Sequence, residues 1–173
     1  MDTPGFTVEV PDFNEIAAEF HARVARMIWC NVATVDQACR PRSRIMHPIW
    51  DGATGYIGTW GTSVRSGHQN PSVKLAHLRE NPHASLAYIS EPMTPVYVDC
   101  RVEIVEDVAG KARFSDLSRS LPEPYGYDPD PMFGGADNPH FVVLQLTALR
   151  IALVDFPAPP GKVLIWRSSE TSG

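Results

Sequence analysis

Short segments rich in β-branched and aromatic residues recur along the chain, and they restrict its fold more than any other feature. They occupy residues 28–35, 41–50, 55–60, 85–90, 95–107, 141–146, 150–156 and 162–167. The turn-prone sequences DQAC and DGAT separate the first three segments, which we expect to form an antiparallel meander. Many short strands with few helices predict a mainly β, antiparallel barrel.

Three stretches have the apolar spacing of amphipathic helices. The first covers residues 12–27, with Asp12 as the predicted N-cap. The second is predicted to begin with Pro71 at its first helical position and to end at Asn81. The third covers residues 110–121. We therefore expect a few helices to flank the barrel.

The length of 173 residues suits one domain, since a chain of this size buries roughly 70% of its unfolded surface. No period of the kind that marks repeat proteins is visible. We expect a single domain over residues 1–173, with its core at 12–167 and a flexible tail at 168–173.

Charge and cysteine usage restrict the partners and the compartment. The chain has 15 Lys and Arg against 20 Asp and Glu, a net charge of -5, with no basic run. We therefore expect no nucleic-acid partner. Cys30, Cys39 and Cys100 match neither a disulfide framework nor a CxxC metal spacing. No apolar run approaches the ~20 residues of a membrane helix, and the start does not resemble a signal peptide. These features predict a cytoplasmic protein with reduced thiols.

A long proline-rich segment lies between the last predicted helix and the strand at 141–146. Residues 122–139 contain the large side chains Tyr125, Tyr127, Met132 and Phe133. A loop of this length inside a compact domain is usually functional or disordered, and its aromatic content argues against disorder. Two interpretations remain open: a stiff connector packed on a partner subunit, or a loop that borders the substrate.

The sequence has no recognisable catalytic machinery of its own. The motifs GxSxG, HExxH, GxxxxGK and GxGxxG are absent, and the six histidines fall on different predicted elements. We therefore identify no catalytic residue and expect no metal site.

Residues of the types that bind anions gather around the start of the second predicted helix. A helix N-terminus offers unpaired N–H groups and partial positive charge, so nearby hydroxyls and cations suit a phosphate. The candidate cofactor-binding residues are Arg42, Arg44, Thr59, Thr62, Ser72 and Lys74.

Three segments carry a resemblance to a known family: ATVDQACRPRSRIMHPIW, GYIGTWGTS and SVKLAHLRENPHASLAYIS. Over about residues 15–110 the chain resembles the pyridoxamine 5'-phosphate oxidase-like superfamily of FMN-binding split β-barrels. The resemblance implies that Arg44, Thr59, Ser72 and Lys74 bind the phosphate of the cofactor. It also implies a homodimer with the isoalloxazine ring in a groove between two subunits.

The resemblance implies an FMN-dependent oxidoreductase that transfers a hydride to or from a small organic substrate. The alternatives are a reductase that uses the deazaflavin coenzyme F420, a non-catalytic flavin or haem binding protein, and a barrel that has lost its cofactor. Ile49 stands where the oxidase has a lysine, Cys39 stands where the family turn has glycine, and we find no C-terminal arginine–histidine pair. We therefore do not expect oxidation of pyridoxamine phosphate.

Overall fold

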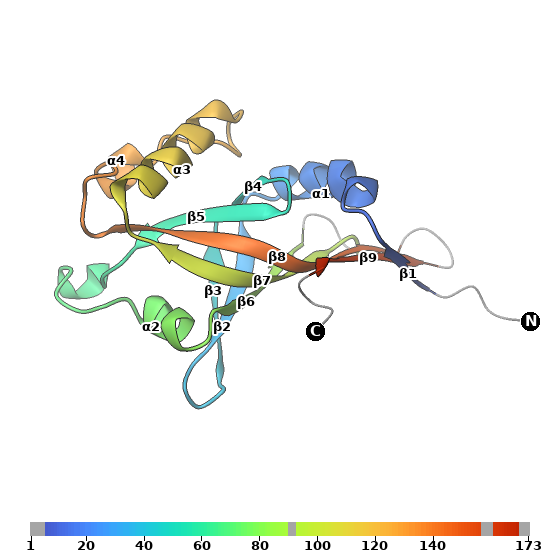
Figure 1. Cartoon of the computed structure of the whole chain (residues 1–173), viewed down its shortest axis with the longest axis horizontal. Coiled ribbons are helices and arrows are strands. Elements are labelled where there is room, and N and C mark those ends of the chain that lie inside the picture. Colours follow the sequence, from blue (N-terminus) through green and yellow to red (C-terminus); the bar gives the residue numbers. More distant parts are fainter. Residues whose placement is uncertain (1–5, 90–92, 157–160, 170–173) are drawn as a thin grey trace, which may run out of the picture.

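The computed structural model describes residues 6–89, 93–156 and 161–169, and its strands form one open sheet. Along the sheet the strands follow the order β1-β9-β8-β7-β6-β2-β3, and β5 pairs with both β8 and β4 (Figure 1). All pairs are antiparallel except β1 with β9. The strands are β1 (Thr7–Val10), β2 (Cys30–Val35), β3 (Pro41–Met46), β4 (Ile49–Asp51), β5 (Thr54–Trp60), β6 (His83–Tyr88), β7 (Val96–Val105), β8 (Phe141–Asp155) and β9 (Lys162–Arg167). The helices are α1 (Asn14–Arg26), the 3-10 turn η1 (Val64–Ser66), α2 (Val73–Glu80), α3 (Val108–Ser120) and α4 (Asp130–Phe133).

The long strand β8 divides the sheet into two arms. One edge of β8 pairs with β7 over almost the whole strand, with a register shift at Asp99 and Cys100. The other edge pairs with β5 from Phe141 to Thr147, and with β9 from Arg150 to Asp155. Because one strand changes partner along its length, the sheet splits instead of closing. This is the predicted split barrel.

Two apolar clusters fill the space between the sheet and its helices. The larger cluster joins α1, through Phe20 and Val24, to sheet residues such as Leu86 and Ile151. The smaller cluster packs Phe114 of α3 with residues of the loop after α3 and of β8. Helices α1, α3 and α4 lie on one side of the sheet and α2 lies on the other (Figure 1). Helix α2 and the hairpin of β2 and β3 therefore enclose a separate region.

The predicted meander is correct only for two of its antiparallel pairs, β2 with β3 and β4 with β5. Residues 41–50 form two strands that are interrupted at His47 and Pro48, and β5 pairs with β4 and β8 but not with β3. Proline has no N–H to donate to a strand ladder, which favours a break at Pro48. Two further segments predicted separately, 141–146 and 150–156, form one continuous strand. The sequence pattern also missed β1.

Helix starts differ from the prediction in detail. Phe13 is the N-cap of α1, although the Asp12 carboxylate still accepts a bond from the Asn14 N–H at 2.9 Å. Ser72 is the N-cap of α2, so Pro71 lies outside the helix and forms a bridge with Thr62. The loop at 122–139 contains the short helix α4. None of the described helices is long and apolar enough to cross a membrane. Of the predicted tail, residues 170–173 lie outside the described residues.

Candidate functional site

Lys74 folds back over the first turn of α2 and reaches the end of β5. Its Nζ donates to the Trp60 carbonyl at 3.2 Å and to the Ser72 Oγ at 3.0 Å. Ser72 is buried, and its backbone N–H donates to the Gly61 carbonyl at 3.0 Å. The start of α2 is therefore fixed to the end of β5, with the lysine ammonium between them.

Arg44 brings a second cation to the same place from β3. Burial lowers the pKa of Lys74 to about 8, with a further contribution from the positive charge of Arg44. Burial also lowers the pKa of the Arg44 guanidinium. Within the described part of the chain, neither cation forms an ion pair with a carboxylate. Two partly buried cations that interact with each other and have no carboxylate partner in the described residues are the type of group that an anion would neutralise.

Helix α2 adds donors to these two cations. The N–H groups of Val73 and Lys74 are the first two of the helix, and such groups have no partner within a helix. They carry the partial positive charge of the helix N-terminus. The cations and the backbone donors therefore suit a phosphate group together.

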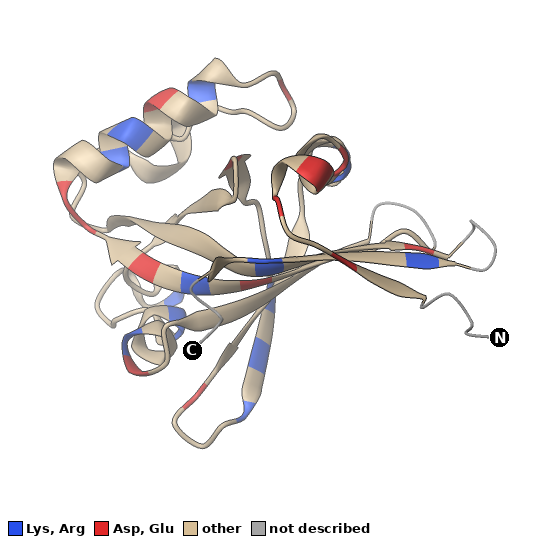
Figure 2. Ribbon diagram, turned by 45° about the vertical axis from the view of Figure 1, so that its right-hand side comes forward, with Lys and Arg blue, Asp and Glu red and all other residues tan. Residues whose placement is uncertain are grey.

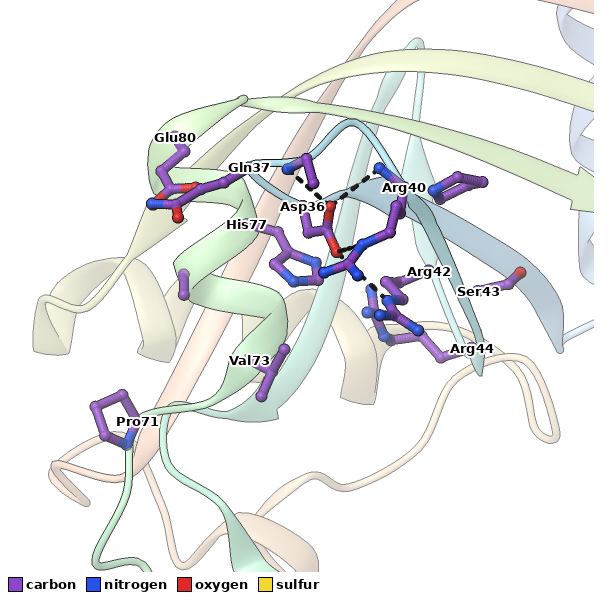
Figure 3. A pocket seen from close by; sticks show the side chains of 13 residues that line it. Asp36, Gln37, Arg40, Arg42, Ser43, Arg44, Pro71, Val73, His77 and Glu80 are labelled. Carbon is purple, nitrogen blue, oxygen red and sulfur yellow. Dashed lines mark hydrogen bonds and ion pairs between the residues drawn. The ribbon is translucent and has the colours of Figure 1, made fainter.

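A groove of about 1000 Å³ extends from Arg44 between the β2–β3 hairpin and α2 (Figure 3). Arg40 and Arg42 also line it, and basic positions follow one another along β3 in Figure 2. The Asp36 Oδ2 lies 2.9 Å from the Arg40 Nε and 3.7 Å from the Arg42 Nε. Hydrogen bonds from Arg40 lower the pKa of the Asp36 carboxyl. Arg42 thus lines the groove but is partly neutralised, unlike Arg44.

An apolar cavity of about 430 Å³ is lined in part by the end of β5, including Thr59 and Trp60. Thr59 is buried and lines this cavity, next to the residue whose carbonyl binds Lys74. Through Trp60, the cavity therefore adjoins Lys74, which together with Arg44 forms what we call the cation pair. Sequence reasoning missed several residues of its wall, which no local motif marks: Ile28, Trp29, Ile45, Met46, His47, Ile57 and Trp60.

The proline-rich loop supplies the far wall of this apolar cavity. Tyr127, Met132 and Phe133 line it, and their predicted place beside the substrate stays a prediction. Phe133 is buried and stacks on Phe141 at 4.7 Å between ring centroids. Tyr125 does not line the cavity, because its hydroxyl accepts a bond from the Trp50 N–H at 2.6 Å within the core. The loop is thus a packed wall, and the connector interpretation involving a partner is untested.

Thr62 is engaged with two histidines that the sequence did not connect. Its hydroxyl lies 2.7 Å from the Nδ1 of His68 and 3.3 Å from the Nδ1 of His140. The two imidazoles stack with centroids 4.7 Å apart. No hydrogen bond connects Thr62 with Arg44 or Lys74 in the described residues. Among those residues there is also no group of three or more His, Cys, Asp or Glu that could hold a metal ion.

Solved structures share this fold at low sequence identity. A Clostridium acetobutylicum protein related to general stress protein 26 of B. subtilis, of the pyridoxinephosphate oxidase family, is 18% identical with a TM-score of 0.65, over 92% of this chain and 98% of that one. A pyridoxamine 5'-phosphate oxidase-related, FMN binding protein from Nostoc punctiforme is 13% identical with a TM-score of 0.63, over 95% and 94%. An F420 reductase is 19% identical with a TM-score of 0.54, over 76% and 94%. No curated protein matches the chain by sequence.

A family model gives the stronger assignment. The model described as pyridoxamine 5'-phosphate oxidase matches residues 16–155. This range includes the cation pair, α2, the groove, the apolar cavity and its loop wall. By this match, the chain belongs to the pyridoxamine 5'-phosphate oxidase family.

Proposed function

We propose that this protein binds FMN and uses it as an oxidoreductase, transferring a hydride to or from a small organic substrate. One observation carries the proposal: Arg44 and Lys74 lie together, partly buried, with no carboxylate paired to either in the described residues. Keeping two like charges close is costly unless an anion joins them. A cofactor phosphate supplies that anion.

The rest of the site fits the remaining parts of a flavin. Ser72 and the first N–H groups of α2 would add donors to the phosphate, and Thr59 stands where the cation pair meets the apolar cavity. The cavity, at about 430 Å³, lies in the range of small-molecule sites. Its aromatic residues Trp60, Tyr127 and Phe133 suit a planar ring.

In this proposal the chain binds and orients, and the flavin supplies the redox chemistry when bound. The cations and α2 anchor one end of the cofactor. Met132, Phe133 and Tyr127 exclude water from the apolar cavity and offer a wall to the substrate. This division of roles explains why the sequence contains no acid–base triad.

A homodimer forms part of the proposal. Trp29, Ile45 and Met132 line the apolar cavity, yet these residues are 53%, 66% and 58% exposed. Large apolar side chains gathered around one opening mark a surface that another molecule covers. A second copy of the chain would cover it and complete the cofactor site.

A deazaflavin is the second candidate cofactor. Besides Arg44, the groove is lined by Arg40 and Arg42 and by the two carboxylates of Asp36 and Glu80. Counting Arg44, three arginines face two carboxylates, and this excess of one positive charge would suit a cofactor whose phosphate bears further negative groups. The absorbance spectrum and mass of the small molecule that copurifies would separate FMN from a deazaflavin.

The test compares FMN with riboflavin, which lacks the phosphate. Arg44→Ala and Lys74→Ala should each weaken FMN binding about ten- to one-hundredfold, since a hydrogen bond to a charged group contributes about 1.5 to 3 kcal/mol. Riboflavin affinity should be unchanged. Arg42→Ala is the matched control, because Arg42 lies on the same strand but is paired with Asp36, and it should weaken FMN binding less. Equal losses of affinity for FMN and riboflavin would refute the phosphate site. Tight flavin binding without turnover of any acceptor would indicate a non-catalytic flavin carrier.

A further inference from the structure

We propose that His77 is a positioning residue of the phosphate site, which acts through Thr34 to orient the guanidinium of Arg44. The inference rests on the proposed function, because it concerns how the same anion site is built. The three side chains come from three elements, α2, β2 and β3, and the family resemblance pointed to neither Thr34 nor His77.

The chain of contacts is continuous. The Arg44 Nη1 donates to the Thr34 Oγ1 at 2.9 Å, and the same oxygen lies 3.1 Å from the His77 Nδ1. Thr34 is 4% exposed and His77 is 7% exposed, so both are shielded from water. Figure 3 shows His77 directed from α2 toward the strand that carries Arg44.

The donor and acceptor roles follow from the chemistry of the groups for Arg44, and we assign them for His77. An arginine only donates, so the Thr34 oxygen accepts from Arg44. The hydroxyl then has one hydrogen of its own, and a buried hydroxyl hydrogen needs an acceptor. Among the described residues the His77 Nδ1 is the other group in contact with this hydroxyl, and we assign it the role of acceptor, with the ring proton on Nε2. His77 thereby keeps the lone pair of Thr34 turned toward Arg44.

Thr34 is the only hydrogen-bond partner of the Arg44 side chain among the described residues. A guanidinium has five N–H donors, so most of those on Arg44 stay available for a ligand. A single neutral anchor sets the direction of the group without neutralising its charge. A carboxylate in the same place would orient the arginine but would repel a phosphate. The Thr34–His77 pair thus suits a cation that must remain free to bind an anion.

The experiment measures the ratio of FMN affinity to riboflavin affinity in variants of the full chain. Thr34→Val and His77→Leu should each lower the FMN affinity about three- to tenfold, in the range of one hydrogen bond, with riboflavin unchanged. Thr34→Ser and His77→Asn retain the hydroxyl and an acceptor in the place of Nδ1, and should restore the ratio. Thr147→Val, the same change on β8, is the control and should leave the ratio unaltered.

A double-mutant cycle separates positioning from structural support. Thr34→Val should have no further effect on the ratio in an Arg44→Ala background if it acts through Arg44. Suppose that Arg44→Ala lowers the ratio of FMN affinity to riboflavin affinity, but Thr34→Val and His77→Leu either leave this ratio unchanged or lower both affinities equally. The positioning role of His77 is then refuted, and the phosphate site stands. If wild type itself shows no preference for FMN over riboflavin, the proposed function fails, and this role with it. Should Thr34→Val not fold, His77→Leu and His77→Asn decide alone.

Discussion

Raising the pH through 8 should weaken FMN binding, because Lys74 then loses its proton. Burial and the positive charge of Arg44 lower the pKa of Lys74 from 10.5 to about 8. A lysine in this state is charged at neutral pH and neutral in mildly alkaline solution. The phosphate of FMN is already fully ionised there, since the second pKa of a phosphate ester is near 6. The change in affinity therefore reports the lysine.

The size of the effect follows from proton linkage. Each pH unit above the pKa of Lys74 removes about nine-tenths of the remaining charged form, so affinity falls about tenfold per unit. The loss ends when the interaction of the charge with the phosphate, about 1.5 to 3 kcal/mol, is exhausted. Between pH 7 and 10 we therefore expect a total loss of about ten- to one-hundredfold.

Flavin fluorescence titrations across this pH range provide the assay. Riboflavin is the control ligand, and its affinity should not follow the same curve. Lys74→Arg is the control variant, because an arginine stays charged over the whole range, so its FMN affinity should be flat near pH 8. The reasoning is refuted if wild type and Lys74→Arg show the same profile, or if riboflavin binding falls in parallel with FMN binding.

Three further predictions concern stability, the loop and assembly. Lys74→Met should stabilise the flavin-free protein at pH 7, because folding lowers the pKa of Lys74 and burying the charged lysine therefore costs folding free energy. This cost is complete below about pH 8 and disappears as the pH rises toward 10.5. Denaturation of wild type and variant at several pH values would show it. Phe133→Ala should lower the free energy of unfolding by about 3 to 5 kcal/mol. Met132 is exposed, so Met132→Ala should leave stability and flavin affinity unchanged but reduce substrate turnover. Light scattering should give twice 19.1 kDa; a monomer that binds flavin tightly would exclude a shared site.

Much of the fold could be predicted, because strand and helix periodicity are local properties. The alternation in β7 and the apolar spacing of α1 marked these elements correctly. The pairing of β5 with β8 could not be predicted, since it joins segments far apart in the chain. Pro48 is the local signal for the break between β3 and β4, and the predicted strand over residues 41–50 does not account for it.

The candidate site was predictable only in part, for the same reason. Ser72 and Lys74 sit in a short motif at a helix start, and Arg44 was a candidate by its residue type before the family resemblance also indicated it. His77 and Thr34 carry no such signal, because a lone histidine on a helix and a threonine on a strand are ordinary core residues. Their relation exists only after folding brings α2 against β2. The same applies to Thr62 with His68 and His140, whose contacts form across three separate segments.

A crystal structure of the protein with FMN would test the central claim most directly. The account predicts that phosphate oxygens lie within about 3.2 Å of the Arg44 guanidinium and the Lys74 Nζ, at the start of α2. It also predicts that Thr34 and His77 retain the contacts with Arg44 described here. A flavin whose phosphate lies away from both cations, or crystals grown with saturating FMN that contain none, would contradict it.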